Sequence, residues 1–540
     1  MNDLTSTRKE SLINAEKLID EEFVDTPLMH LNYSQAIWTV LSVAEDMYWK
    51  HTVLAPLPHE AQHIYLDGLI NSIAHPTKAL FHKRNEPTKR VKIRMFDEHY
   101  GWVISWLEQS QKYGMFCSIF PLWHKGKLDL NINGNTIEPE IQEIDSNNYA
   151  YEAYNRFTRK DGNIEERHLE PDIVIEDIIK NTTQQDLKFS LNFNAKLVKK
   201  LRHEHGKTLG HRYVLPSHWT VGGVQFQDFK TVFTTIQAML YGWHIARVYV
   251  ASKKVHCLGY PSAVWVVDRS ELVARLLKYT DVDGNVISKI LSYLTFGEHD
   301  IRDPDIALQP LVELTKNCFA LSPLLWINSN AERNLCALFN KIPELRQSYL
   351  ELTLEKEQVL RQEITEALTD YSYEIRFGKL SDTDLDIAII DRANKICACI
   401  ELKWFIEPAE IREVIERSAE LKKGVRQAKT IRNYFDMDDS VLMSTVLDID
   451  KSYRFASFVG SRNWIGYHDV QDLSTPIIKI WHFIKILKEL GLGEALNWLE
   501  NRSYLPVNGK EFTVVLLDIE FGNWKSKWYG MMACEDEQPV

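Results

Sequence analysis

The stretch from Asp384 to Trp404, DLDIAIIDRANKICACIELKW, contains two apolar runs separated by a short polar turn. Runs of this length and composition, bounded by turn residues, predict two buried β-strands joined as a hairpin. Successive side chains of a strand point to opposite faces. One face of the second strand therefore carries Cys397, Cys399, Glu401 and Lys403, and the other carries Ile396, Ala398, Ile400 and Leu402. The aliphatic face is expected to pack on a helix.

The charged residues of this hairpin gather at one end. In the first strand, Asp386 shares a face with Ala388 and Ile390. If the two strands pair, Asp386 and Glu401 lie close together, and Lys403 lies two residues beyond Glu401. Two neighbouring carboxylates repel, and each raises the pKa of the other unless a cation lies between them. The hairpin therefore predicts a site for a divalent cation.

Mg²⁺ suits such a pair, because it binds oxygen, usually from one or two carboxylates together with waters and substrate phosphate. We expect the carboxylates of Asp386 and Glu401 and the backbone carbonyl of Leu402 as its ligands. The metal would polarise a phosphoryl oxygen and acidify a water for in-line attack. Lys403 would supply positive charge where negative charge develops. The residues thus predict a phosphodiesterase site with Mg²⁺ as cofactor.

The arrangement resembles the PD-(D/E)XK nuclease superfamily, the fold of restriction endonucleases and of related repair and recombination nucleases. The matching residues are Asp386 in DLDIAII and the ELK of Glu401–Lys403, and the resemblance covers residues 345–470. It implies that Asp386 and Glu401 bind Mg²⁺, for which Mn²⁺ can substitute, and that Lys403 is the catalytic lysine. The Pro-Asp pair of the family is missing, since Leu385 precedes Asp386. Asp384 is an alternative metal ligand or a helper.

The resemblance also implies a glutamate on the helix before the strands, and Glu357 is the candidate for this catalytic position. At 100° per residue, one stripe of that helix holds Leu350, Thr353, Glu357, Leu360, Ile364 and Leu368. A carboxylate within an apolar stripe is unfavourable without a partner. A catalytic role and a plain salt bridge both explain Glu357.

Some members of the family carry a Gln and a Tyr on the helix after the lysine strand. Gln427 and Tyr434 are the candidates here, and their spacing of seven residues puts them on one helical face, although the usual spacing is four. The same helix carries five cations: Lys422, Lys423, Arg426, Lys429 and Arg432. They suit either contacts to phosphate or a solvated helix face.

The predicted elements from residue 348 onward follow the order helix, three strands, helix, strand, or αβββαβ. The fold class is therefore α+β or mixed, with a restriction-endonuclease-like domain over residues 346–540. We expect the helix after the lysine strand to break at Gly424. A helix near residues 475–500 and the strand KEFTVVLLDIEF are expected to extend this domain.

Two further domains are expected in the first 345 residues. Residues 1–205 predict a mostly helical domain with a polar hairpin or loop insertion, NINGNTIEPEIQEIDSNNY and TRKDGNIEERHLEP. Residues 206–345 predict more helices, including a long one after the Gly-Gly turn of HWTVGGVQFQDFK. Residues 262–327 have the order of a winged-helix unit, which is also the order of many packing subdomains. The second interpretation is favoured, because the helix GNVISKILSYL has one Lys and no Arg.

The motif HEAQH at residues 59–63 matches a zinc-protease pattern, with His59 and His63 as ligands and Glu60 as base. Pro58 makes His59 an early helix position, whereas such sites usually lie inside a long helix. A convincing third ligand does not follow in the sequence. We therefore expect only the start of a surface helix here.

The composition limits the location and the partners of the chain. A net charge of −12 argues against a protein that coats polyanions generally, but it is compatible with a local basic groove. The seven Cys form no CxxC pair, which predicts reduced thiols and a cytoplasmic protein. No signal-peptide core and no run of about 20 apolar residues are present, so we expect no membrane association.

The sequence favours a Mg²⁺-dependent DNA endonuclease that acts in prokaryotic restriction or anti-phage defence. DNA is favoured over RNA as the partner, but an RNA-directed nuclease is an open alternative. A second alternative is a non-catalytic nucleic-acid-binding or assembly protein that keeps the nuclease fold. A homo-oligomer and a partner protein of a defence system are both compatible with the chain.

Overall fold

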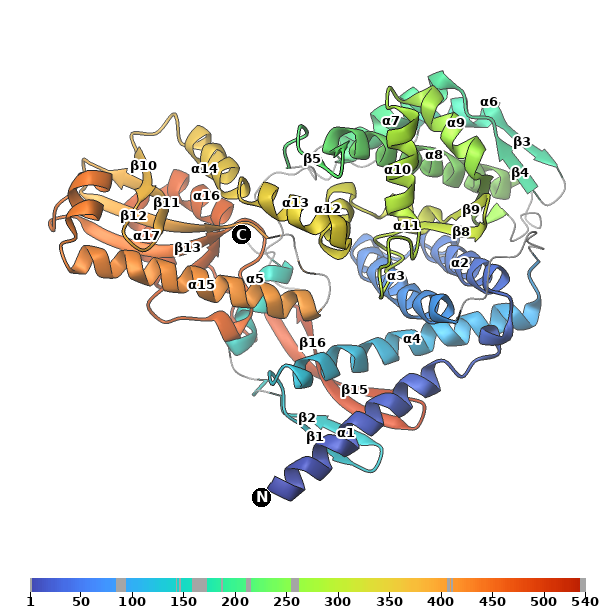
Figure 1. Ribbon diagram of the computed structural model, residues 1–540, viewed down its shortest axis with the longest axis horizontal. Coiled ribbons are helices and arrows are strands. Elements are labelled where there is room, and N and C mark those ends of the chain that lie inside the picture. Colours follow the sequence, from blue (N-terminus) through green and yellow to red (C-terminus); the bar gives the residue numbers. More distant parts are fainter. Residues whose placement is uncertain are drawn as a thin grey trace. The chain divides into compact units, whose positions relative to one another are not determined.

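The computed structural model in Figure 1 describes residues 2–83, 94–141, 143–144, 147–157, 172–185, 188–209, 215–253, 262–405, 408 and 411–534. The fold is mixed α/β, mostly helical, with several small sheets. The chain forms two compact units. Unit 1 comprises Met1–Cys117, Glu165–Leu350 and Phe521–Trp524, and unit 2 comprises Ser118–Ile164, Glu351–Glu520 and Lys525–Val540. Residues 118–164 thus group with the C-terminal region.

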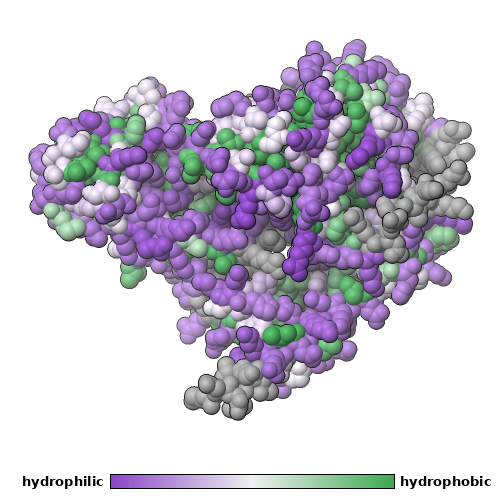
Figure 2. Space-filling view, viewed as in Figure 1, coloured by the Kyte–Doolittle hydropathy of each residue, from purple (hydrophilic) through white to green (hydrophobic). Residues whose placement is uncertain are grey.

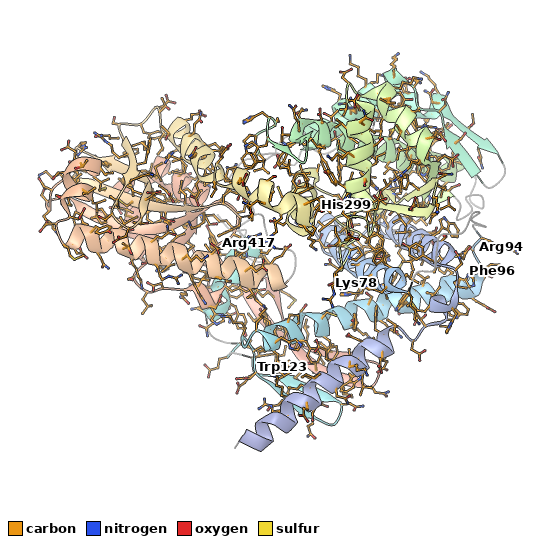
Figure 3. The ribbon with its side chains drawn as sticks, viewed as in Figure 1. Lys78, Arg94, Phe96, Trp123, His299 and Arg417 are labelled. Carbon is orange, nitrogen blue, oxygen red and sulfur yellow. The ribbon has the colours of Figure 1, made fainter. Side chains whose placement is uncertain are left out.

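Unit 1 begins with a series of helices, in line with the mostly helical first domain that the sequence predicted. They are α1 (Asn2–Phe23), η1 (Pro27–His30), α2 (Tyr33–Trp49), η2 (Lys50–Leu54), α3 (His59–His82) and most of α4 (Asp97–His124). Helix α3 starts at His59, in line with the expected helix start, although the side chains of His59, Glu60 and His63 lie outside the described residues. Lys78 of α3 forms an ion pair of 2.7 Å with Asp303 in the same unit (Figure 3).

The centre of unit 1 is the long helix predicted after the Gly-Gly turn. Before it come α6 (Asp172–Asn181), the hairpin β3 (Thr182–Gln185) and β4 (Lys188–Leu191), and α7 (Ala195–Leu209). The turn joins β5 (Thr220–Val221) to β6 (Val224–Gln225), and α8 (Phe226–Lys253) follows. Gly222 and Gly223 have φ values of +58° and +73°, which glycine adopts without steric cost.

Residues 265–321 hold the predicted strand, two helices and hairpin. These are β7 (Trp265–Asp268), α9 (Arg269–Tyr279), α10 (Gly284–Leu294), β8 (Leu311–Thr315) and β9 (Cys318–Leu321). The three strands form an antiparallel sheet in the order β7-β9-β8, and α8 packs against α9 and α10. Three helices follow: α11 (Pro323–Ile327), α12 (Ala331–Lys341) and α13 (Pro343–Thr353).

Unit 2 is built around a five-stranded sheet. Its strands are β10 (Glu374–Lys379), β11 (Asp384–Asp391), β12 (Ile396–Lys403), β13 (Arg454–Ser461) and β14 (Ile477–Lys479). The first three strands pair antiparallel, and β12, β13 and β14 pair parallel. The helical elements are α14 (Lys356–Ala367), α15 (Ile411–Asp436), η6 (Val441–Leu447), η7 (His468–Val470), α16 (Ile480–Leu490) and α17 (Leu492–Glu500). The expected αβββαβ order is present from α14 to β13.

Helices cover both faces of this sheet. On one face Cys397 and Cys399 pack with Ile431 and Phe435 of α15 and with η6 in a single buried cluster. On the other face, a Cβ on Gly460 of β13 would lie 2.8 Å from Ile400 and 3.0 Å from Ile480 of α16. The aliphatic face of β12 therefore packs on helices, as its alternation predicted.

The strand that was expected to extend this domain lies in unit 2 up to Glu520, but it belongs to a separate sheet. β15 (Phe512–Phe521) does not join the five-stranded sheet but a second one, in the order β1-β2-β16-β15, with β1 (Leu130–Asn133), β2 (Thr136–Pro139) and β16 (Trp524–Ala533). The parallel pair Lys525↔Thr136 joins segments almost 400 residues apart. Against this sheet, Tyr149 of η3 (Asn147–Tyr149) and Ala153 of α5 (Ala150–Phe157) pack with Phe512 and Val514. The polar stretch 158–171 lies outside the described residues.

Two helix predictions are also wrong in detail. The single helix expected from residue 348 is two helices, because α13 ends at Thr353 and α14 begins at Lys356. Leu350, placed in an apolar stripe, is 43% exposed as a result. Helix α15 is continuous through Gly424, where we expected a break.

No disulfide joins any of the six described cysteines, which are Cys117, Cys318, Cys336, Cys397, Cys399 and Cys534, and Cys257 lies outside the described residues. Hydrophilic residues dominate the face drawn in Figure 2, with apolar residues in small patches. Across the described residues, we find no helix with the length and apolar character needed to cross a bilayer.

Candidate active site

The two strands of the predicted hairpin pair, as the interpretation of the charged residues required. Their antiparallel register runs from Asp391↔Ile396 through Ala388↔Cys399 to Ile387↔Ile400. One step further along this register, Asp386 comes opposite Glu401. The hairpin therefore brings its charged residues to one end. The central residues of both strands are buried and pack in the core.

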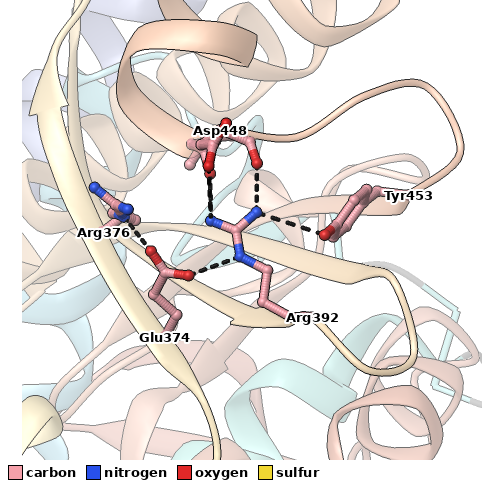
Figure 4. A network of polar contacts seen from close by, with 6 residues as sticks. Glu374, Arg376, Arg392, Asp448 and Tyr453 are labelled. Carbon is pink, nitrogen blue, oxygen red and sulfur yellow. Dashed lines mark hydrogen bonds and ion pairs between the residues drawn. The ribbon is translucent and has the colours of Figure 1, made fainter.

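A polar network fixes the other end of the hairpin (Figure 4). Arg392, in the turn after β11, forms an ion pair of 2.7 Å with Glu374 of β10. Its guanidinium also donates to the Leu447 carbonyl at 3.0 Å and to the Asp448 carbonyl. The cation of Arg392 lowers the pKa of Glu374, and Glu374 in turn raises the pKa of Arg392. These contacts hold the turn in place. The paired strands that leave the turn then determine where the charged end lies.

Lys403 lies between two carboxylates at the charged end. Its Nζ is 2.7 Å from Glu401 Oε1 and 3.4 Å from Glu357 Oε1 of α14. The side chain of Glu401 is 2% exposed, that of Lys403 is 13% exposed, and that of Glu357 is 44% exposed. Glu357 is thus a half-exposed partner of Lys403 and does not lie within a buried apolar stripe.

Asp386 is tied to the same strand end through the backbone. Its Oδ2 accepts a hydrogen bond of 2.7 Å from the N–H of Leu402, the residue between Glu401 and Lys403. The N–H and the C=O of one strand residue point to the same side. The Leu402 carbonyl, predicted as a metal ligand, therefore faces the side on which Asp386 lies.

The electrostatics of the site are those of carboxylates held together in a dry environment. Burial, followed by the charge of Glu357, raises the pKa of Asp386 to about 6. Burial, followed by the charge of Asp386, raises the pKa of Glu401 to about 8. Burial alone would lower the pKa of Lys403, but the charges of Glu401 and Glu357 raise it to about 12. Of the mutual effect that the sequence predicted for Asp386 and Glu401, the part in which Asp386 raises the pKa of Glu401 is present.

The donor set fits a hard divalent cation. Glu401 Oε2 is buried and has no hydrogen-bond partner among the described residues, so one carboxylate oxygen is available. Asp386 and Glu401 supply two carboxylates, and Leu402 supplies a carbonyl, which suits Mg²⁺ because this ion keeps several waters. Within the described ranges, no group of three or more His, Cys, Asp and Glu side chains is arranged to hold a metal. The two-carboxylate set is therefore the candidate.

The other predicted residues do not join this group. Asp384 is exposed and lies opposite Lys379 of β10 in the strand register. The Tyr434 hydroxyl donates to Asp382 at 2.9 Å, so this flank of α15 faces the β10–β11 turn. For Gln427, on the same flank, the described part of the chain shows no polar contact. Gln427 therefore stays a prediction without a contact to support it.

The basic helix is largely neutralised by acidic partners within the protein. Four of its five cations form ion pairs: Lys422 with Asp469 at 3.1 Å, Lys423 with Glu420 at 2.5 Å, Lys429 with Asp472 at 2.5 Å and Arg432 with Asp436 at 3.3 Å. This favours the solvated helix face over a set of free phosphate contacts.

Sequence reasoning missed the contribution of Gly424 to the site. A Cβ at this position of α15 would lie 3.2 Å from Cε of Lys403 and 3.6 Å from Cγ of Glu401. The helix therefore approaches the ion pair closely where it has no side chain. A glycine inside a helical pattern signals either a break or a close approach, and only the packing distinguishes them.

Arg361 and Arg462 were also missed, although both lie beside the candidate residues. Arg361 Nη1 donates to the Asp386 carbonyl at 3.4 Å. The N–H of Arg462 donates to the Lys403 carbonyl at 2.8 Å, and its guanidinium pairs with Glu363 at 2.5 Å. No signal in the sequence distinguishes them from other surface arginines.

Comparison of the chain with protein-family models, with curated proteins and with solved structures finds no match.

Proposed function

We propose that unit 2 carries a Mg²⁺-dependent nuclease of the restriction-endonuclease-like type, acting on DNA. The observation that carries this proposal is the meeting of Asp386 and Glu401 beside Lys403 at the end of two paired strands. The order α14-β10-β11-β12-α15-β13 and the mixed sheet agree with the resemblance stated for residues 345–470. Both lines of support come from this chain alone.

Each residue has a definite role in the proposed reaction. Asp386, Glu401 and the Leu402 carbonyl would hold Mg²⁺, which supplies Lewis acidity toward a phosphoryl oxygen and lowers the pKa of a bound water. Lys403 holds its ammonium group next to Glu401 and stabilises the negative charge that develops on the phosphate. Glu357 orients Lys403 from α14, and the N–H of Leu402 orients Asp386.

The unit from β7 to β9 has the helix and strand order of a winged helix, and we infer that its role is structural. The exposed residues of α10 are Asn285, Ser288 and Lys289, and Lys289 is the only cation of this helix. A helix that reads the major groove normally offers several basic or amide side chains to phosphates and bases. α10 offers too few for that role.

Cleavage assays on the full chain test the proposal. Matched DNA and RNA substrates are incubated with Mg²⁺, with Mn²⁺ or with EDTA, and three variants are compared: Asp386→Asn, Glu401→Gln and Lys403→Ala. We expect metal-dependent DNA cleavage that each substitution lowers by at least about 100-fold, as loss of one charge-stabilising group does elsewhere. Cleavage that survives Lys403→Ala would contradict the proposal. Cleavage of RNA alone would replace DNA as the substrate, and binding without cleavage would indicate a non-catalytic protein.

A further inference from the structure

Strand β11, which carries Asp386, contains a β-bulge where it pairs with β10. β10 and β11 pair as Arg376↔Ala388 on one side of it and as Gly378↔Leu385 on the other. Phe377 alone therefore faces two residues of β11, Asp386 and Ile387. A bulge bends the strand and redirects a side chain, and bulges are frequent beside active sites.

The residue of β10 that lies opposite the bulge, Phe377, has a large and exposed aromatic side chain. Phe377 is 56% exposed, although it lies in the middle of a strand. The guanidinium of Arg361 lies 4.0 Å from the centre of its ring. One face of the ring is thus covered by a cation, and the remaining face and edge account for the exposure.

Arg361 connects this ring to the candidate site. Its Nη1 donates to the carbonyl of Asp386 at 3.4 Å, and Phe377 of β10 lies opposite Asp386 and Ile387. Arg361, the ring of Phe377 and the proposed metal ligand therefore meet at one short segment of β11. Lys379, two residues beyond Phe377 on β10, is exposed and forms no ion pair among the described residues. The surface around Phe377 therefore combines an aromatic face with positive charge.

We propose that Phe377 and Arg361 form a stacking platform for an unpaired base of the DNA substrate. This inference rests on the proposed function, because it places the base next to the phosphate bound at Asp386, Glu401 and Lys403. An aromatic ring stacks on any base, and an arginine adds attraction both to the ring and to phosphate. In an intact duplex the bases are stacked on one another and cannot reach such a ring. The substrate class is then single-stranded DNA, or DNA with a locally unpaired segment.

Binding of the full chain to DNA in EDTA tests the platform without any step of cleavage. The probes are a single-stranded oligonucleotide that carries 2-aminopurine, whose fluorescence responds to stacking, and the duplex of the same sequence. We expect tighter binding of the single strand, and Phe377→Ala should weaken it by roughly 5- to 150-fold, the range for loss of one base–aromatic stack. Phe377→Trp should retain both the affinity and the fluorescence change.

Tyr371→Ala is the matched control, because Tyr371 is another exposed aromatic residue of unit 2, 37% exposed, stacked on Tyr373. It should bind like the unchanged protein. Equal binding of the single strand by Phe377→Ala and the unchanged protein would overturn the platform, and so would equal binding of duplex and single strand. If the Phe377 effect is found but no metal-dependent cleavage exists, the proposed function fails and the platform remains.

Discussion

Asp386 Oδ2 accepts a hydrogen bond of 2.7 Å from the backbone N–H of Leu402. The bond joins β11 at its bulge to β12 between Glu401 and Lys403, and so it places two carboxylates and an ammonium group at one strand end. The carboxylate that we propose as a metal ligand is also a structural link. Substitutions that keep or remove the acceptor oxygen distinguish these two roles.

Asp386→Asn should abolish metal-dependent cleavage without destabilising the protein. The amide oxygen of Asn still accepts from the N–H of Leu402, whereas the negative charge is lost. Asp386→Ala removes the acceptor, and a buried N–H without a partner costs about 1–3 kcal/mol. Denaturant unfolding of both variants checks the difference. Equal destabilisation by Asn and Ala would show that the hydrogen bond does not support the strand end.

Lys403→Met should destabilise the protein through Glu401. The Glu401 side chain is 2% exposed and its Oε1 is 2.7 Å from Lys403 Nζ, so above about pH 8, where Glu401 is ionised, the variant leaves a buried carboxylate without its cation. Removal of one partner of a buried pair costs about 3–5 kcal/mol, and Glu401→Gln in the same chain should recover part of it. Denaturant unfolding of the single and double variants measures the coupling.

The exposed pair of Lys423 and Glu420 provides the control for Lys403→Met. Its side chains are 56% and 44% exposed, and such pairs contribute about 0–1 kcal/mol. Lys423→Met should therefore change the free energy of unfolding by less than about 1 kcal/mol. A loss as large as that of Lys403→Met would show that burial does not distinguish the two pairs.

Binding of Mg²⁺ should strengthen as the pH rises and should release protons. The pKa of Asp386 is raised to about 6 and that of Glu401 to about 8, so in the metal-free protein Glu401 holds a proton near neutral pH, and Asp386 holds one only at about pH 6 and below. A cation needs both groups ionised, and it displaces their protons. Calorimetric titration of Mg²⁺ in buffers of different ionisation enthalpy counts the released protons. The count should fall as the pH rises past the pKa of Glu401, and a count of zero at every pH would contradict the site.

The hairpin and its charged end could be predicted because the information is local. The alternation of small and aliphatic residues from Ile396 to Lys403 places Glu401 and Lys403 on one face, whatever the strand pairs with. Asp386 needed one further assumption, that the two strands are neighbours, and the register confirms it. The bulge of β11 opposite Phe377 could not be foreseen, because it depends on how the residues of two strands pair.

The ends of the helices were predicted less well, because tertiary contacts determine where a helix ends or continues. Glu357 was placed by counting from Leu350, but the helix ends at Thr353 and restarts at Lys356, so the helical phase is lost. Gly424 suggested a break because of its low helix propensity, whereas packing against Lys403 keeps the helix straight through it. The pairing of β15 and β16 with β2 joins distant segments, and local patterns carry no information about it.

Gly424→Ala should lower the cleavage rate while leaving the protein folded. The new Cβ would lie 3.2 Å from Cε of Lys403, so the lysine must move by a few tenths of an ångström. Alanine gains up to about 1 kcal/mol of helix propensity over glycine, which offsets the crowding. Cleavage rate and free energy of unfolding, measured on the same preparation, separate the two effects.

Gly101 of α4 is the matched glycine for this comparison, because a Cβ there would meet no heavy atom within 4 Å. Gly101→Ala should raise the free energy of unfolding by up to about 1 kcal/mol and leave cleavage unchanged. If Gly424→Ala behaves in the same way, the close approach to Lys403 is not required for the reaction.

Glu45→Gln should remove a pH dependence of stability that originates in unit 1. Glu45 of α2 is fully buried, and its Oε1 accepts from the Ser322 hydroxyl and from the N–H of Leu324 at 2.8 Å. Burial raises its pKa from 4.5 to about 7, so its contribution to stability is complete below about pH 4.5 and is lost as the pH rises through about 7. Gln keeps the acceptor and cannot ionise. In denaturant unfolding, the free energy of unfolding of the variant should therefore exceed that of the unchanged protein by up to about 3 kcal/mol near pH 8. At pH 4.5 the two values should be equal. Glu176→Gln, at an 82% exposed side chain, should follow the unchanged protein at both pH values.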